Sequence, residues 1–215
     1  MDKLKQIIKP YYRALKETAL YRSFNTVQNL FFRHNNLLVA LIKAKAKGNK
    51  LIVGRGVVLR HCHFTMQGRG NMVEIGDGCI LSRMGVFMNS DGNTLILGKK
   101  TKVNGSKENG TSFNPCGGAG IIVGEQCLFS NGVKLHTTDY HKIVSEGKQI
   151  NCPDNIVLGN HCWIGLQCLI LKGTVLQDNV IVGAKSILNK NYEQSNVMLA
   201  GSPAKVIKTD VNWEA

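Results

Sequence analysis

A six-residue repeat restricts what this chain can fold into more than any other feature of its sequence. From Leu158 to Leu188 an aliphatic residue returns at every sixth position, and a small or β-branched residue follows four positions after each of the first five. Neither a helix nor an ordinary strand has this period. The repeat predicts stacked coils, because one coil cannot bury its own apolar side. The expected inward residues are Leu158, Ile164, Ile170, Leu176, Val182 and Leu188, with Cys162, Cys168, Thr174, Val180 and Ser186 between them.

The same spacing occurs earlier, so we expect one repeat architecture for most of the chain. The step from Leu135 to Leu158 is not a multiple of six, which predicts that an excursion loop over about 141–154 leaves the coil and returns to it. Loops on a rigid scaffold commonly carry binding groups. Smaller irregularities fall at 88–96 and 104–120. The earlier inward residues are expected to be Ile75, Leu81, Phe87, Leu97, Val103, Val123, Phe129 and Leu135.

Positive charge is concentrated at the N-terminus. The formal net charge is +13, and residues 1–50 hold 11 Lys and Arg against Asp2 and Glu17. Apolar residues recur there at helical spacing, so we expect a basic helical segment that caps the first coil or contacts an anionic membrane surface. Its apolar runs are too short for a membrane span or a signal peptide. No nucleic-acid-binding motif accompanies the charge, so nucleic acid is not an expected partner.

The seven cysteines are not arranged like a metal site or a disulfide framework. Cys79, Cys127, Cys162 and Cys168 occupy the small inward position of the repeat, and no CxxC pair occurs. A free cysteine packs as a small hydrophobic residue, so these four are expected in the core. The odd count and the lack of an export signal favour a cytoplasmic location.

The segment at 136–141 (HTTDYH) carries the strongest candidates for chemistry. If the chain is extended there, Asp139 and His141 project to the same side. A carboxylate beside an imidazole can orient it, and histidine titrates close enough to neutral pH to act as a general base. The alternative is a loop histidine that satisfies a backbone carbonyl.

Four features in order make the chain similar to the hexapeptide-repeat acyltransferases. They are HTTDYH at 136–141, GNHCWIG at 159–165, the unbroken repeats to Leu188, and AGSPAKVIK at 200–208. The likeness covers about 51–208 and is greatest to the O-acetyltransferases of bacterial surface polysaccharides, including polysialic acid. It implies an all-β, left-handed parallel β-helix over 51–208, between the N-terminal segment 1–50 and a C-terminal tail at 209–215. It also implies a cytoplasmic homotrimer that uses acetyl-CoA without a metal.

The resemblance assigns roles to individual residues. His141 matches the catalytic base, Asp139 is its expected orienter, and Trp163 matches a residue at the thioester end of the donor site. The backbone N–H of Leu166 corresponds to a main-chain donor for the oxyanion that forms during transfer. Further acetyl-CoA contacts are expected at Gly165, Gly183, Ala184, Lys190, Ser202, Lys205 and Lys208, and contacts to the carbohydrate acceptor at Asn114, His136 and Tyr140.

Three other functions remain open from the sequence. An N-acetyltransferase acting on an amino-sugar nucleotide would also need a base. His136 and His141 have the spacing of the zinc-binding histidine pair in the γ-class carbonic anhydrases, although AGSPAK has no place there. A non-catalytic scaffold would not need the interrupted coil. A basic N-terminus would suit peripheral contact with the inner face of the membrane.

Overall fold

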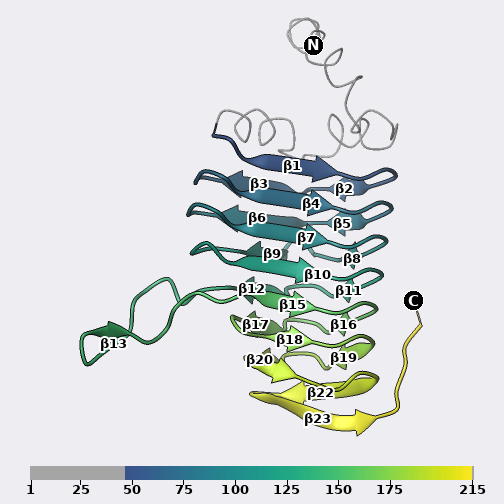
Figure 1. Cartoon of the computed structure of the whole chain (residues 1–215). Coiled ribbons are helices and arrows are strands. Elements are labelled where there is room, and N and C mark those ends of the chain that lie inside the picture. The colour runs from purple at the N-terminus through teal and green to yellow at the C-terminus, as the bar shows by residue number, and fades with distance from the viewer. Residues whose placement is uncertain (1–46, 215) are drawn as a thin grey trace, which may run out of the picture.

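The computed structural model describes residues 47–214 as one stack of parallel coils. Three sheets form the sides of the coil, and the chain visits each of them once per turn (Figure 1). Sheet A contains β1 (Lys50–Val53), β4 (Met72–Ile75), β7 (Thr94–Leu97), β10 (Gly120–Val123), β15 (Ile156–Leu158), β18 (Val175–Leu176) and β21 (Asn191–Tyr192).

Sheets B and C complete the triangular cross-section. Sheet B contains β2 (Val58–Arg60), β5 (Ile80–Ser82), β8 (Lys102–Val103), β11 (Leu128–Phe129), β16 (Trp163–Ile164), β19 (Val180–Val182), β22 (Val197–Gly201) and β23 (Ala204–Thr209). Sheet C contains β3 (His63–Met66), β6 (Met84–Met88), β9 (Thr111–Asn114), β12 (Lys134–His136), β17 (Leu169–Leu171) and β20 (Ile187–Leu188). A separate hairpin pairs β13 (Val144–Ser145) with β14 (Lys148–Gln149).

The six-residue repeat forms the core as expected. All six aliphatic residues from Leu158 to Leu188 are buried, and residues of successive coils stack on one another: Leu158 on Leu176, and Ile164 on Val182. Each coil thus buries its apolar side against its neighbours, and this burial is the main favourable contribution to folding, at about 25 cal/mol per Å² of apolar surface.

The cysteines of the repeat lie in the core, which confirms the interpretation as core residues. The thiol of Cys79 donates to the carbonyl of Gly98 in the next coil at 3.2 Å, and Cys168 donates to Gly183 at 3.1 Å. Burial raises the pKa of the Cys79 thiol to about 11, so the reactive thiolate is disfavoured. All seven cysteines are free, and Cys152 alone among them is exposed.

One of the expected inward residues, Phe87, points outward instead. In the first coils equivalent turn residues lie 22 positions apart, as Asn49 and Asn71 do, whereas Asn160 and Asp178 lie 18 apart. Although these coils are longer, the turn before β6 is shorter: Leu81 and Val86 lie five positions apart, whereas Ile164 and Ile170, in register with them, lie six apart. Met88 is therefore buried while Phe87 is 45% exposed. Because side chains alternate along a strand, this one-residue shift reverses the direction of the ring.

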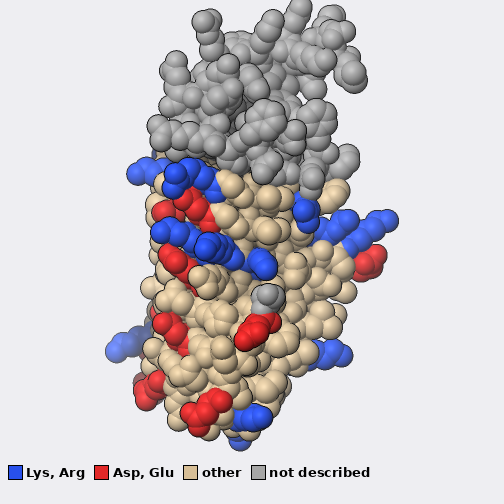
Figure 2. Space-filling view, turned by 90° about the vertical axis from the view of Figure 1, so that its right-hand side faces the viewer, with Lys and Arg blue, Asp and Glu red and all other residues tan. Residues whose placement is uncertain are grey.

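The turns between sheets A and B carry charges of both signs. Figure 2 faces this corner of the coil and shows basic and acidic side chains interleaved along it. Arg55 pairs with Asp77 at 3.1 Å, and Lys99 pairs with Glu125 at 3.8 Å. Exposed pairs of this kind contribute about 0–1 kcal/mol each, so they set the charge pattern of the corner rather than the stability of the fold.

Most of the expected helical segment at 1–50 lies outside the described residues, and β1 begins the coil at Lys50. No helix able to span a membrane is present within residues 47–214. At the other end β23 pairs antiparallel with β22. The last residues then run back across the coils and pack on them: Trp213 is 8% exposed and stacks on His161, with ring centroids 4.3 Å apart.

Candidate active site

The excursion leaves the coil after β12 and rejoins it before β15. Its two ends meet where the backbone N–H of Asp154 donates to the carbonyl of Thr137 at 3.0 Å. Between them the chain projects from the coil and forms the β13–β14 hairpin, at the left of Figure 1. The excursion therefore spans 137–154, and the expected loop of about 141–154 forms most of it.

The side chain of Asn151 joins both arms of the excursion at its base. Its amide donates to the carbonyl of His141 and to the carboxylate of Asp139, both at 2.8 Å, and its oxygen accepts from the backbone N–H of Ile143 at 2.7 Å. Lys172, from the next coil, donates to the same Asp139 oxygen at 2.6 Å. We call these four residues, His141, Asp139, Asn151 and Lys172, the base clamp.

The expected direct contact between Asp139 and the imidazole of His141 is absent. Within residues 47–214 no hydrogen bond joins those two side chains. The Asp139 carboxylate instead accepts hydrogen bonds from Lys172 and Asn151. The premise of an extended chain is wrong, because β12 ends at His136 and Tyr140 adopts a φ of 63°. Hydrogen bonds from Lys172 and then from Asn151 lower the pKa of Asp139. The Asp139 carboxylate is thus linked to the His141 carbonyl through Asn151, while the Asp139 carbonyl accepts directly from the His141 backbone N–H at 2.8 Å.

His136 and Tyr140 form a second pair beside the clamp. The Nδ1 atom of His136 lies 3.2 Å from the Tyr140 hydroxyl, and their rings meet edge to face. Burial, and then the charge of Lys134, lower the pKa of His136, whereas burial raises the pKa of Tyr140. Both groups are therefore neutral near pH 7 and able to hydrogen-bond a hydroxyl. Asn114 lies beside His136 in register, and its buried amide donates to the carbonyl of Leu135 at 3.1 Å.

Trp163 projects outward from sheet B with 37% of its surface exposed. Its indole N–H donates to the hydroxyl of Ser130 at 3.3 Å, and its ring lies 6.1 Å from that of Trp213. Trp213 is fixed in turn by His161: the indole N–H of Trp213 donates to the His161 carbonyl at 2.8 Å, and His161 Nε2 lies 3.1 Å from the Trp213 carbonyl. Trp163 thus has an aromatic neighbour supplied by the end of the chain.

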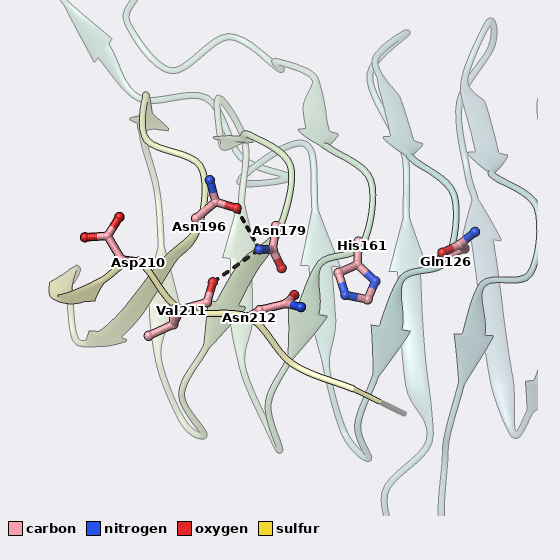
Figure 3. Close-up of a pocket in the computed structure, with 7 residues that line it drawn as sticks. All are labelled: Gln126, His161, Asn179, Asn196, Asp210, Val211 and Asn212. Atoms are coloured by element: carbon pink, nitrogen blue, oxygen red, sulfur yellow. Dashed lines mark hydrogen bonds between the residues drawn. The ribbon is translucent and has the colours of Figure 1, made fainter.

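A shallow cavity of about 580 Å³ lies beside this contact and is drawn in Figure 3. Asn179 donates to the Asn196 side chain at 2.7 Å and to the carbonyl of Val211 at 3.2 Å, which holds the returning chain against successive turns. These hydrogen bonds anchor residues 210–214 beside the cavity. Its lining is mainly amide side chains and consists of Gln126, His161, Asn179, Asn196, Asp210, Val211 and Asn212.

The turn after Trp163 exposes a backbone donor. Among the described residues the N–H of Leu166 has no hydrogen-bond partner, while its neighbours Gly165 and Gln167 donate to Val182 and Asn131. A side chain on Gly165 would come within 2.5 Å of the Val182 carbonyl. Glycine is therefore required there by the stacking of the coils.

The other expected acetyl-CoA contacts lie on later coils. Gly183 packs against Ala200, Ala184 is exposed in the adjoining turn, and Ser202 lies in the turn between β22 and β23. The ammonium group of Lys190 lies over the Tyr192 ring, 5.4 Å from its centroid. Lys205 and Lys208 are exposed on β23. Within 47–214 no carboxylate forms a salt bridge with these three lysines.

Within one chain, the candidate base and the expected acetyl-CoA contacts lie apart. His141 follows β12 of sheet C at the base of the excursion, whereas Trp163 lies on sheet B, which adjoins the opposite corner in Figure 1. The sequence missed Asn151, Lys172 and Trp213, because their partners are set by the turns and no local motif marks them. No group of three or more His, Cys, Asp or Glu that could hold a metal ion occurs in residues 47–214.

The fold is the left-handed parallel β-helix expected from the sequence. It matches the structure of the polySia specific acetyltransferase NeuO with a TM-score of 0.64 and 23% identity, over 78% of this chain and 85% of that one. No family model matches the chain.

Several curated proteins match parts of the sequence, among them two O-acetyltransferases. The chain is 30% identical to a polysialic acid O-acetyltransferase of Neisseria meningitidis over 95 residues, 43% of this chain and 44% of that protein. It is 33% identical to the galactoside O-acetyltransferase of Escherichia coli (strain K12) over 91 residues, 41% and 43% of the two chains. The matched region spans less than half the length of these relatives. They carry the same class of chemistry that the segments at 136–141 and 200–208 indicate.

Proposed function

We propose that the protein is an acetyl-CoA-dependent O-acetyltransferase that acts on a hydroxyl of a bacterial cell-surface sugar. The observation that carries the proposal is the base clamp, which holds an exposed histidine at the root of an excursion from a rigid coil. A histidine whose backbone is held in place beside open surface is suited to removing a proton from a bound hydroxyl. The polysaccharide and galactoside O-acetyltransferases among the relatives support this substrate class.

Transfer proceeds directly, without a covalent enzyme intermediate. The imidazole of His141 accepts the proton as the acceptor oxygen bonds to the thioester carbonyl carbon. The negative charge that develops on the carbonyl oxygen is stabilised by the free N–H of Leu166, and one such donor contributes about 2.7–4 kcal/mol. When the intermediate collapses, the C–S bond breaks and the sulfur of CoA receives the proton from His141. Acetylated sugar and free CoA leave.

The complete site requires more than one copy of the chain, and we propose a homotrimer. Leu166 lies at the corner between sheets B and C and His141 at the corner between sheets C and A, so we propose that a neighbouring subunit brings a base and an oxyanion donor to the same thioester. The cleft between subunits would hold acetyl-CoA along Trp163, Gly165, Gly183 and Ala184. Lys190, Lys205, Lys208 and Ser202 would face its phosphates, as unpaired cations suit phosphate groups.

On the acceptor side, His136, Tyr140 and Asn114 would contact the sugar, and Asp139 would position the base through Asn151. We further propose that the basic segment 1–50 provides peripheral contact with anionic lipid when the acceptor is membrane-linked. Co-sedimentation of full-length protein with phosphatidylglycerol vesicles tests this part alone, and recovery of all the protein in the supernatant rejects it.

The decisive test measures CoA release with acetyl-CoA and a panel of oligosaccharides and amino-sugar nucleotides. We expect turnover with sugar hydroxyls, and His141→Ala should reduce it by at least about 10²-fold while the protein stays folded. Glu146→Ala, at the tip of the excursion, is the matched control and should retain activity. Undiminished turnover by His141→Ala would remove the base assignment, and turnover of amino-sugar nucleotides alone would replace O-transfer by N-transfer.

A further inference from the structure

Phe87 forms an aromatic platform on the outer face of sheet C. Its side chain is 45% exposed, and its ring lies across Gly85 on the same strand. A side-chain carbon on Gly85 would come within 2.7 Å of the ring, so glycine is what allows the ring to lie against the sheet. The ring therefore covers the strand and offers an apolar surface to solvent.

A cavity of about 540 Å³ surrounds this platform with polar and basic groups. His63 and Thr65 border it from β3, Arg83 from the turn before β6, and Lys107 from the loop between β8 and β9. Within 47–214 no salt bridge neutralises Arg83 or Lys107. The cavity thus combines an apolar floor with two cations that form no salt bridge within residues 47–214.

The strand register connects this cavity to the candidate active site. Val86 pairs with Phe113, and Asn114 pairs with His136, so Phe87, Asn114 and His136 fall at the same register position on successive coils. Neighbouring strands lie about 4.8 Å apart. The platform is therefore roughly 10 Å from His136 along sheet C, a distance that a short run of linked sugar rings can span.

We infer that the Phe87 cavity is a second glycan subsite, which binds an acidic sugar unit of the acceptor away from the reacting hydroxyl. The C–H face of a sugar ring packs on an aromatic ring, while Arg83 and Lys107 suit a carboxylate, which the planar guanidinium binds with two parallel hydrogen bonds. The inference rests on the proposed function and deepens it, because it makes the acceptor an acidic oligosaccharide rather than a single sugar. Filling the subsite stabilises substrate and transition state alike, so it acts through KM.

Acceptor length is the first variable to test. With α2,8-linked oligosialic acids of increasing length as probes, kcat/KM of the wild type should rise with length and then level off. Phe87→Ala should reduce kcat/KM for the longer probes by about tenfold, chiefly through KM, and leave the monosaccharide unchanged. Ile52→Ala, another exposed apolar side chain but on sheet A, is the matched control. Length-independent kcat/KM in the wild type would overturn the subsite.

Charge preference is the second variable. Arg83→Gln should lower kcat/KM for oligosialic acid by about tenfold and leave neutral maltooligosaccharides unaffected. Direct calorimetric binding of oligosialic acid, without acetyl-CoA, separates this inference from the proposed function. Binding that Phe87→Ala weakens supports the subsite even when no acetyl transfer occurs, whereas equal binding by the wild type and Phe87→Ala rejects it even when transfer is confirmed.

Discussion

At the scale of single residues, Asn151 connects the candidate base to the rest of the fold. Its side chain contacts the backbone of His141 and Ile143 as well as the Asp139 carboxylate. A histidine held only by its own backbone would sample many positions, and small displacements of a catalytic group are costly in rate. Asn151 is therefore a positioning residue: it acts through His141 and does not contact the substrate.

We predict that Asn151→Ala lowers kcat by about 10–100-fold and leaves the KM for acetyl-CoA nearly unchanged. Hydrogen exchange should accelerate over 137–154 but not in the coil, which separates a loosened excursion from global destabilisation. Ser145→Ala, at an exposed position in the β13–β14 hairpin, is the control and should behave like the wild type. An unchanged kcat in Asn151→Ala, with the excursion measurably loosened, would show that the clamp does not set the position of the base.

Lys172 determines the ionisation of Asp139. Its hydrogen bond is the largest cause of the lowered pKa of Asp139. Because the folded-state pKa lies below the unfolded value of about 3.9, the pair stabilises the excursion above that pH, and the contribution is lost as pH falls through the folded pKa. The clamp should therefore remain intact throughout the neutral range.

Replacing Lys172 by methionine removes the cation and keeps most of the stem. We expect the pKa of Asp139 to rise toward the ordinary aspartate value, measured by a ¹³C NMR titration of its carboxyl carbon. Lys148→Met, in the distant hairpin, should leave that titration unchanged. If Asp139 titrates identically in Lys172→Met and the wild type, the 2.6 Å ion pair is not formed in solution.

At the scale of elements, the turns contain side chains that satisfy the backbone of neighbouring coils. Asn49, Asn71 and Asn93 lie one above another at the corner between sheets C and A, and each of the first two accepts from the backbone N–H of the next. Asn93 accepts in turn from Gly118 at 2.9 Å and donates to Asn71 at 2.8 Å. This asparagine ladder joins four coils through buried amide groups.

Asn93→Ala should lower the free energy of unfolding by about 1–3 kcal/mol, because it removes a buried amide that donates to Asn71 and accepts from Gly118. Asp91→Ala is the matched control. Asp91 accepts from Arg69 at the same corner, but in an exposed position where water replaces the lost acceptor. Its effect should stay within about 0.5 kcal/mol. Equal losses in urea titrations of the two variants would contradict a specific role for the ladder.

The sequence predicted the elements better than it predicted the turns between them. The repeat located the inward residues from Leu158 to Leu188, because each lies within a coil of regular length. It failed at Phe87, where a shorter turn reverses the strand, and at Asp139, where a residue with positive φ ends the extended chain. Turn geometry depends on contacts between coils, so the six-residue period carries no information about it.

The same limit applies to the candidate site. HTTDYH marked the entry to the excursion, because it is a local pattern. Asn151, Lys172 and Trp213 act through partners 10, 33 and 52 residues away. A pairing of this kind requires the path of the chain, which only the three-dimensional structure provides.

At the scale of the whole molecule, the proposed site is divided between subunits, and a substitution at Leu166 would remove its oxyanion donor alone. Gln167, the next residue, has a φ of 55°, and proline is favoured at the position before such a residue in a type II turn. The N–H that proline removes has no partner in the described part of the chain. Leu166→Pro should therefore fold normally and lose about 10²–10³-fold in kcat. Asn131→Pro, in the equivalent turn one coil earlier, is the control for folding.

Mixing two inactive variants tests whether the halves come from different chains. Trimers reassembled from equal amounts of His141→Ala and Leu166→Pro contain interfaces where an intact His141 meets an intact Leu166 of the neighbour. Random assembly gives about one quarter of such interfaces, so the mixture should recover roughly a quarter of wild-type activity although each variant alone is inactive. Mixed trimers that assemble, as shown by native mass spectrometry, but stay inactive would place both groups in one subunit's site and reject the shared cleft.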